Sequence, residues 1–399
     1  MNVEQADKLL TVLLERLVSE GGSDLFITAG FAPAIKKDGR LVALMERALG
    51  PEQAERLVAA SMSHAQCAMF AETQEAQFAI AGAAGRFRVS AFVQRGHSGA
   101  VIRVINTEIP TLADLDLPDT LAELVMAQRG LVLFVGATGS GKSTSLAAML
   151  GHRNRHAAGH IITLEDPIEF VHEHAASIVT QREIGVDTQS WTAALQNTLR
   201  QAPDVILVGE VRSRETMEHA LNFAETGHLV LASLHANNAS QAIDRVLNLF
   251  DEAERAQRLM DLSLNLRGVV SQRLVRRAAG GRVPALELLL ATPLVSDLIL
   301  RGRLVELREA MARGAEQGMQ TFDQHLFALY EAGAIDLTEA LRHADSANEL
   351  RLNIKLASQR AAREQTDAID GLSLDLADTP DSDASGARYS HQPDGSPHR

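Results

Sequence analysis

Cysteine and aromatic residues are scarce in this chain of 399 residues, and their scarcity limits what the protein can be. Cys67 is the single cysteine, which excludes an internal disulfide framework and any zinc site with several cysteine ligands. A reducing cytoplasm fits this composition best. Aromatic residues make up only 4% of the chain, so the expected cores are filled by Leu, Val, Ile and Ala, within an ordinary hydrophobic share of 46%.

The sequence also lacks a net positive charge and long apolar runs. The chain has 38 Lys and Arg against 51 Asp and Glu, a formal net charge of −13, which disfavours binding to nucleic acid or to an anionic membrane. No apolar stretch reaches the roughly 18 to 20 residues that span a bilayer. The start of the chain, 1–8, lacks the pattern of a signal peptide. We therefore expect a cytoplasmic protein without direct membrane insertion.

Changes of pattern along the chain predict two folded domains and a tail. Residues 1–108 combine a helical stretch with short β-rich segments and are expected to form a small α+β domain. Two prolines within 109–120 indicate a linker. Residues 121–357 are expected to form the second domain. Residues 358–399 are acidic and rich in turn residues, and we expect a disordered tail because they bury too little apolar surface to offset the entropy of ordering.

Within 121–357, short apolar runs alternate with helical patterns. Such runs are typical of a parallel sheet that is buried on both faces, and they lie at 131–135, 161–164, 205–208 and 229–233. From about residue 251 the sequence is rich in Leu, Ala and Arg, so we expect a C-terminal helical subdomain there. The predicted fold class is α/β, preceded by the α+β domain.

The most specific motif is a phosphate-binding loop. Its residues match the pattern GxxxxGK[S/T] between an apolar strand and a helix, and the predicted nucleotide-binding residues are Gly136, Ala137, Thr138, Gly139, Ser140, Gly141, Lys142, Ser143 and Thr144. The glycines let successive backbone N–H groups converge on a phosphate at a helix N-terminus. Lys142 adds a positive charge for the β- and γ-phosphates, and the Ser143 hydroxyl can ligate Mg²⁺. The predicted cofactors are ATP and Mg²⁺.

Acidic residues follow two of the predicted strands. Glu165, Asp166 and Glu169 come after the run 161–164, and Glu210 follows 205–208 as the acid of a Walker B element does, although that acid is usually aspartate. Ligands of an open α/β sheet collect at the carboxyl ends of its strands, so these carboxylates should face the phosphates. Glu210 is expected to hold Mg²⁺, directly or through water. Glu165 and Glu169 both stay open as the residue nearer the attacking water.

Two histidines and several arginines are further candidates. His235 follows the run 229–233 at its carboxyl end, where it can sense the γ-phosphate, whereas His228 lies at the opposite end. Arginines on or near the N-terminal strands, among them Arg88 and Arg103, form either a solvated basic face or arginine fingers. Such fingers stabilise phosphoryl charge across a domain or subunit interface.

Four motifs in order and spacing resemble the type II/IV secretion ATPase superfamily, and within it the PilT/PilU family of type IV pilus retraction ATPases. They are the Walker A, Asp-box, Walker B and His-box patterns at Gly136–Ser143, Ile162–Phe170, Leu199–Arg212 and Ala224–Ala236. The resemblance covers about residues 3–357. It implies a PAS-like N-terminal domain, a RecA-like P-loop NTPase domain and a hexameric ring.

The same resemblance implies roles for single residues. It assigns Glu169 to activating the attacking water, Glu210 to the magnesium shell, His235 to sensing the γ-phosphate, and Arg88 with Arg103 to clamping the nucleotide.

Two segments depart from the family patterns. The Walker B signature usually continues Gly-Glu-Leu/Met-Arg-Asp but reads Gly-Glu-Val-Arg-Ser over 209–213. Residues 294–299 read Leu-Val-Ser-Asp-Leu-Ile where the PilT branch carries Ala-Ile-Arg-Asn-Leu-Ile. This stretch, with 318–324 and 342–347, is most similar to the PilU branch.

The expected function is a hexameric ATP-hydrolysing motor that drives or assists pilus retraction in twitching motility. Its implied partners are a PilT-like retraction ATPase and an inner-membrane pilus platform protein. The alternative is a nucleotide-gated accessory subunit that supports a PilT partner with little hydrolysis of its own. A RecA-like nucleic-acid translocase is disfavoured by the acidic charge and the lack of basic residues interleaved with aromatic ones.

Overall fold

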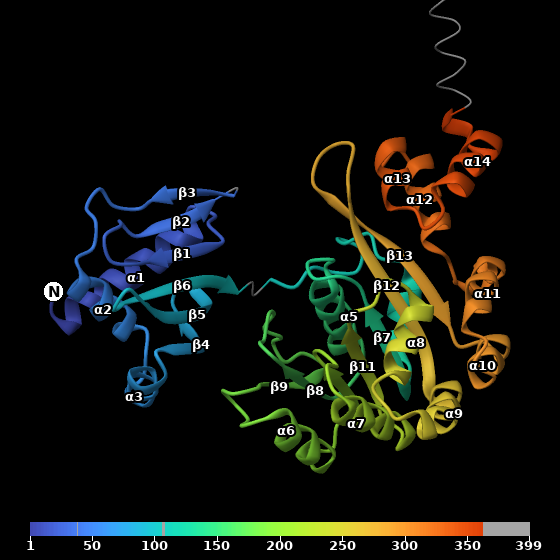
Figure 1. Ribbon diagram of the computed structural model, residues 1–399, viewed down its shortest axis with the longest axis horizontal. Helices are drawn as coiled ribbons and strands as arrows, with labels where there is room; N and C mark the ends of the chain where they lie inside the picture. Colours follow the sequence, from blue (N-terminus) through green and yellow to red (C-terminus); the bar gives the residue numbers. More distant parts are fainter. Residues whose placement is uncertain (38, 106–107, 362–399) are drawn as a thin grey trace, which may run out of the picture.

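The computed structural model describes residues 1–37, 39–105 and 108–361, which form two sheets with their helices (Figure 1). The first sheet is antiparallel, with the order β3-β2-β1-β6-β5-β4. In chain order its elements are α1 Val3–Ser19, β1 Asp24–Ile27, β2 Ala34–Lys37, β3 Arg40–Ala43, α2 Pro51–Ala60, α3 His64–Thr73, β4 Glu75–Gly82, β5 Gly85–Gln94 and β6 His97–Ile105.

Helix α1 shows why this first part folds as it does. It begins at a capping box, in which the side chains of Asn2 and Gln5 each accept from the other residue's backbone N–H. Leucines spaced along one side are buried against the sheet, and Gly21, at φ 69°, follows the helix end. Strand β5 alternates: Phe87 and Val89 are buried, while Arg86 and Arg88 are half-buried. The core is thus built from one face of each element.

The second sheet has seven strands in the order β13-β12-β7-β11-β10-β8-β9. Its pairs are parallel except for β12 with β13. Its elements are α4 Asp119–Met126, β7 Gly130–Val135, α5 Lys142–His156, β8 Gly159–Glu165, β9 Ser177–Glu183, α6 Trp191–Thr198, β10 Val205–Val208, α7 Arg214–Glu225, β11 Leu229–Leu234, α8 Ala239–Leu247, α9 Arg255–Asn265, β12 Leu266–Arg276 and β13 Arg282–Leu290.

Both faces of this sheet are covered, which explains the continuous apolar runs. In β7, Leu131, Leu133 and Val135 belong to a core with α7, α8 and α9, whereas Val132 and Phe134 belong to a second core with α4 and α5. A strand with a helix layer on each side needs apolar residues at every position. All six residues of β7 are buried.

The helical subdomain expected from about residue 251 also contains two strands, which the sequence analysis did not predict. Strands β12 and β13 form a long hairpin that extends the sheet beyond β7, with Gly280 and Gly281 at positive φ in its turn. The Leu-rich composition resembles that of helices because this hairpin is also packed on both faces: Val269 joins one core and Val270 the other. The Gly-Gly pair is the signal that could have located the turn.

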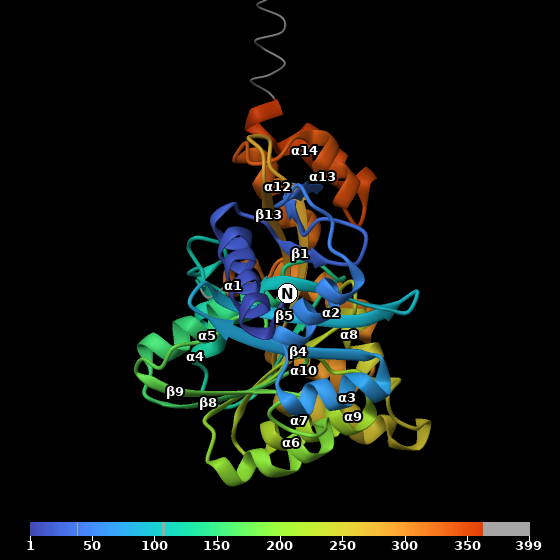
Figure 2. The ribbon, with the colours of Figure 1, turned by 90° about the vertical axis from the view of Figure 1, so that its left-hand side faces the viewer.

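Helices follow the hairpin, as expected for the last part of 121–357. They are α10 Pro293–Leu300, α11 Leu307–Arg313, α12 Phe322–Glu331, α13 Leu337–His343 and α14 Ala347–Ala357. In both ribbon views α12, α13 and α14 gather beside one end of the hairpin (Figures 1 and 2). Their core is centred on Phe322, Leu326 and Tyr330 and includes Val275 and Val283 from the hairpin.

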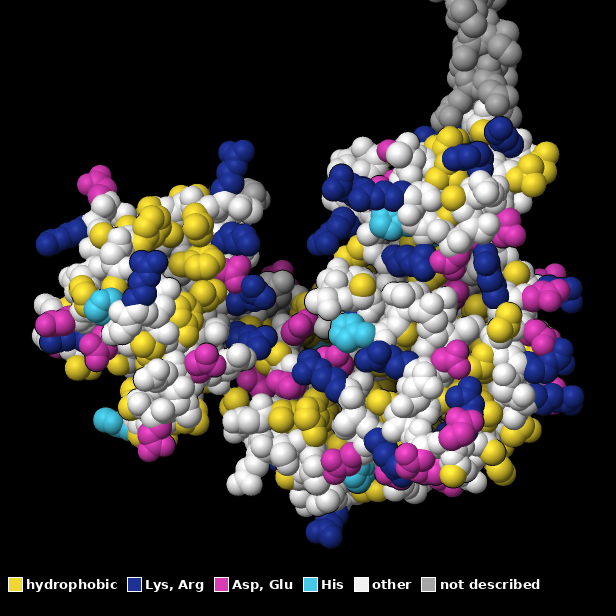
Figure 3. Space-filling model, viewed as in Figure 1, with side chains coloured by type: hydrophobic (Ala, Val, Ile, Leu, Met, Phe, Trp, Pro, Cys, Tyr) yellow, Lys and Arg dark blue, Asp and Glu magenta, His cyan; other side chains and the backbone are white. Residues whose placement is uncertain are grey.

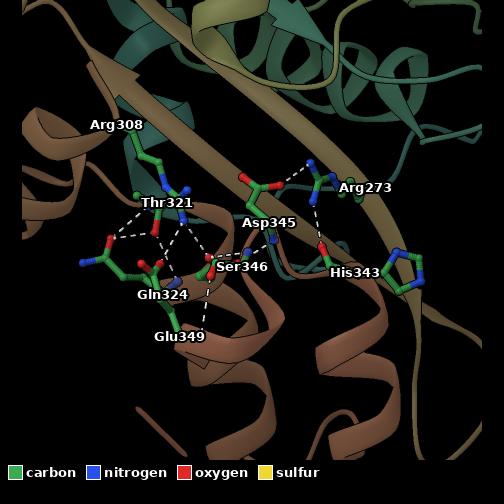
Figure 4. A network of polar contacts seen from close by, with 9 residues as sticks. Arg273, Arg308, Thr321, Gln324, His343, Asp345, Ser346 and Glu349 are labelled. Carbon is green, nitrogen blue, oxygen red and sulfur yellow. Dashed lines mark hydrogen bonds and ion pairs between the residues drawn. The ribbon is translucent and has the colours of Figure 1, made fainter. Parts of the chain in front are cut away.

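Polar contacts join these helices to β12. The Arg273 guanidinium lies 3.8 Å from the centre of the Phe322 ring, pairs with Asp345 at 2.7 Å and donates to the His343 carbonyl (Figure 4). Arg308 of α11 pairs with Asp323, whose carboxylate also accepts from the backbone N–H of Asp345. The C-terminal helices are therefore fixed to the strand next to β7.

Within the described part of the chain, no helix combines the length and the hydropathy needed to cross a bilayer. The tail that we expect to be disordered spans 358–399. Residues 362–399 of it lie outside the described residues.

Candidate nucleotide-binding site

The phosphate-binding loop joins β7 to α5, in the strand–loop–helix context that the motif predicts. Gly139 and Gly141 adopt φ values of 76° and 87°, which favour glycine, and Gly141 is the N-cap of α5. A Cβ atom at Gly136 would lie 2.5 Å from Ser140 Oγ and 2.6 Å from the carbonyl oxygen of Gln272. The loop backbone is therefore tightly packed against β12 as well as shaped for an anion at the helix N-terminus.

Lys142, the first residue of α5, turns its side chain back over the loop. Its Nζ donates to the carbonyl oxygens of Gly136 and Ala137, at 2.7 and 3.0 Å. Burial lowers the pKa of the Lys142 ammonium, while the negative charges of Glu210 and Glu169 raise it in part. The ammonium therefore faces two of the predicted acidic residues.

Glu210 and His235 form a pair at the carboxyl ends of neighbouring strands β10 and β11. His235 Nε2 lies 2.9 Å from one Glu210 oxygen, and Arg212 pairs with the other at 2.6 Å. The second ring nitrogen of His235 lies 3.3 Å from the Gly136 carbonyl, so His235 connects Glu210 to the loop. Burial raises the pKa of Glu210, but the hydrogen bond and charge of Arg212, with His235 and Lys142, outweigh it, and the net pKa is lowered. Glu210 is thus held as a carboxylate.

Glu165 and Glu169, which the sequence left as alternatives, occupy different environments after β8. Glu165 accepts from the Thr163 hydroxyl at 2.6 Å and from Gln181 Nε2 at 3.1 Å, and burial raises its pKa despite these hydrogen bonds. Glu169 is exposed and lines the same pocket. Glu165 is therefore fixed by its neighbours, and Glu169 is the more accessible carboxylate.

One pocket of about 480 Å³ brings most of the predicted residues together, within the range of small-molecule sites. Its lining includes Gly139, Gly141, Lys142, Ser143, Thr144, Glu165, Asp166, Glu169, Glu210, Arg212 and His235. Figure 3 shows acidic, basic and histidine side chains gathered where this half of the molecule faces the first sheet. The strand ends, the loop and the acids therefore share one polar concavity.

The structure does not bring the N-terminal arginines into this pocket. Arg88 donates to Gln77 at 2.9 Å and Arg103 to Asp24 at 2.7 Å, both within the first sheet. His228 also lies away from the pocket, at the other end of β11, with Nδ1 3.1 Å from the Phe223 carbonyl. Only His235 of the two histidines joins the site.

Ser213 explains one departure from the family pattern. Its side chain accepts from the Thr216 backbone N–H and caps α7, and it does not line the pocket. Aspartate is an equally good N-cap residue, so the usual Asp and this Ser can fill one structural position.

Sequence reasoning missed the hairpin's contribution to the site. Leu274 and Arg282 line the pocket, and Gln272 donates to the Ser140 carbonyl of the loop. A lone Gln within a Val- and Leu-rich strand is the signal that could have drawn attention to it.

Known proteins provide an independent comparison. A family model described as "Type II/IV secretion system protein" matches residues 3–367. The type IV pilus ATPase PilU of Pseudomonas aeruginosa is 55% identical over 379 residues, which are 94% of this chain and 98% of that protein. The type IV pilus retraction ATPase PilT of the same organism is 41% identical over 84% of this chain and 98% of its own length.

A solved structure agrees with these relatives. The crystal structure of the pilus retraction motor PilT with bound ADP is 40% identical, with a TM-score of 0.80 over 84% of this chain and 98% of that one. The matches confirm the resemblance drawn from the four motifs, including its PilU branch. The chain belongs to the type II/IV secretion system protein family and is an ATPase of its PilT/PilU group.

Proposed function

We propose that this chain is a motor subunit that hydrolyses ATP with Mg²⁺ to drive or assist type IV pilus retraction. The observation that carries the proposal is the single pocket in which Lys142, Glu169, Glu210 and His235 meet at the carboxyl ends of adjacent strands. The similarity to PilU and PilT, over almost the full length of each, supports the link to the pilus.

The residues of the pocket fit a magnesium ion beside the phosphates. The Ser143 hydroxyl and the Glu210 carboxylate are oxygen donors of the kind that Mg²⁺ prefers, and Glu210 is kept ionised by Arg212. When bound, Mg²⁺ neutralises charge on the phosphates. Lys142 then binds the β- and γ-phosphates, with the N–H groups of the loop around them.

Glu169 is proposed to accept the proton of the attacking water. It lines the pocket as an exposed carboxylate. Glu165 is less free to accept a proton from water, because it already accepts hydrogen bonds from Thr163 and Gln181. His235 contacts both Glu210 and the loop carbonyl of Gly136, so a change at the γ-phosphate can reach either one through its ring.

The proposal includes a hexameric ring. Arg88 and Arg103 do not reach the pocket of their own chain, and the Arg103 side chain is 65% exposed. We propose that they clamp the nucleotide of a neighbouring subunit, so that each site is completed across an interface. Residues 1–108 would then act as the PAS-like domain, joined by 109–120 to the RecA-like domain at 121–357.

The remaining partners are proposed from the family alone. They are a PilT-like retraction ATPase and an inner-membrane pilus platform protein at the cytoplasmic face. The higher identity to PilU than to PilT also supports an alternative, an accessory subunit that binds nucleotide and assists a PilT partner with little hydrolysis of its own.

Steady-state ATPase activity of the purified chain tests the proposal, alone and mixed with a PilT partner. Lys142→Ala should abolish nucleotide binding, and Glu169→Ala should preserve binding while lowering kcat by about 10²-fold or more. Activity of the chain alone that both variants lose supports an autonomous motor. Activity that appears only with the partner, while the chain alone still binds nucleotide, supports the accessory role. A chain that stays monomeric at every concentration, with and without nucleotide, would refute the ring.

A further inference from the structure

Gln272 of β12 contacts the phosphate-binding loop and does not line the pocket. Its side chain is buried, with 2% of the residue exposed. The amide Nε2 donates to the Ser140 carbonyl at 2.7 Å, and the amide oxygen accepts from the Ser145 hydroxyl at 2.8 Å. Ser140 precedes Gly141 and Lys142, and Ser145 lies in the first turn of α5. One amide therefore connects the loop to the helix that follows it.

Two loop glycines are packed against the same residue. A Cβ atom at Gly141 would lie 2.7 Å from Gln272 Nε2, and one at Gly136 would lie 2.6 Å from its carbonyl oxygen. A side chain at Gly136 would meet the backbone of β12, and one at Gly141 would displace the Gln272 amide. The approach to β12 is thus a second reason, besides the phosphate, for glycine at these two positions.

Strand β12 is itself firmly held. Arg273, the next residue, points to the other face of the strand, where it pairs with Asp345 (Figure 4). Its guanidinium also lies over the Phe322 ring. Gln272 therefore extends from a rigid support toward a loop made largely of glycine and small residues.

We propose that Gln272 is a positioning residue for nucleotide binding, and that its amide sets the spacing between the Ser140 carbonyl and the first turn of α5. The N–H groups of residues 141–144, part of the predicted phosphate-binding set, lie between these two points, so their convergence depends on that spacing. Gln272 does not line the pocket and acts only through the loop. The inference rests on the proposed binding of ATP at Gly136–Thr144.

The chemistry of the amide makes the role specific. The Ser140 carbonyl oxygen needs a hydrogen-bond donor, and the Ser145 hydroxyl, which donates, needs an acceptor. The Gln272 amide supplies both. Gln272→Glu loses the donor and turns a negative charge toward a carbonyl. Gln272→Met keeps the approximate size and loses both hydrogen bonds.

The test measures the Kd for ADP and ATP by calorimetry on the full chain, together with KM, kcat and Tm. Both Gln272 variants should raise Kd and KM by about tenfold or more and change kcat by less than about threefold, because lost uniform binding appears in KM. Ser145→Ala should raise Kd by about threefold, and its effect should not add to that of Gln272→Met, because both remove the same contact.

Ser271→Ala is the matched control. Ser271 and Ser145 are both buried hydroxyls that each donate one hydrogen bond to a side-chain oxygen, but Ser271 does not contact the loop. It should leave Kd unchanged. Equal Kd values for wild type and Ser145→Ala, or an equal rise in Ser145→Ala and Ser271→Ala, would overturn the proposal even if the Gln272 variants fail to fold. A wild-type chain that binds no nucleotide would instead refute the proposed function.

Discussion

Glu287 of β13 is a buried carboxyl group whose protonation should couple stability to pH. Only 2% of the residue is exposed, and its Oε1 accepts from the Ala239 backbone N–H at 2.7 Å and from Ser271. Burial raises its pKa from the ordinary value of 4.5 to about 7, against the lowering effect of these hydrogen bonds. Asp345 raises the pKa further and Arg273 opposes it. We predict that Glu287→Gln stabilises the protein above neutral pH.

The direction follows from proton binding in the two states. Between 4.5 and about 7 the folded chain holds a proton at Glu287 that the unfolded chain releases, so the free energy of unfolding falls as pH rises through this window. The stabilisation from this proton is complete below pH 4.5 and is lost above about pH 7. The separation of the two values corresponds to roughly 3 kcal/mol, and each pH unit within the window to about 1.4 kcal/mol. Glutamine keeps the acceptor for Ala239 and cannot ionise.

Urea unfolding followed by tryptophan fluorescence measures this effect, because the single tryptophan, Trp191, packs against the core that contains β7, β10 and β11. The stability of Glu287→Gln relative to wild type should rise by about 1.4 kcal/mol per pH unit up to about pH 7 and then level off. Glu309→Gln, an exposed glutamate paired with Arg313, is the control and should follow the wild-type profile. Parallel profiles for wild type and Glu287→Gln would refute the reasoning.

The remaining predictions concern catalysis and packing. Glu169→Gln should lower kcat by about 10²-fold or more with little change in KM, and Glu165→Gln should lower kcat by less than about tenfold, because Glu165 is fixed by other side chains. Initial rates over a range of ATP concentrations give kcat and KM for both variants, and the reverse order of the two kcat losses would contradict the assignment. Phe322→Ala should lower the free energy of unfolding by about 3–5 kcal/mol, because the ring is fully buried under Arg273. Phe31→Ala, at a residue 51% exposed, should change it by less than about 0.5 kcal/mol in the same melt, and similar losses for the two would rule out the packing argument.

Contiguous motifs were predicted well because their geometry is local. The loop Gly136–Thr144 needs only a strand before it, a helix after it and glycines within it, and all three are readable in sequence. Glu169 and Glu210, which the sequence places after two strands, both line the pocket because parallel strands end at one edge of a sheet. The sequence could not rank Glu165 against Glu169, because their difference arises from Gln181, a residue of the next strand.

The sequence by itself determined the nucleotide loop, the alternation of buried strands with helices, and the four motifs that identify the family. Only the tertiary structure decided that 266–290 is a hairpin, that Gln272 contacts the loop from the neighbouring strand, and that Arg88 and Arg103 stay outside their own pocket. The physical reason is the distance along the chain between the residues that interact. Local signals depend on backbone preference and on periodicity within one element, whereas Gln272 and Ser140 are 132 residues apart and meet only when β12 packs beside β7.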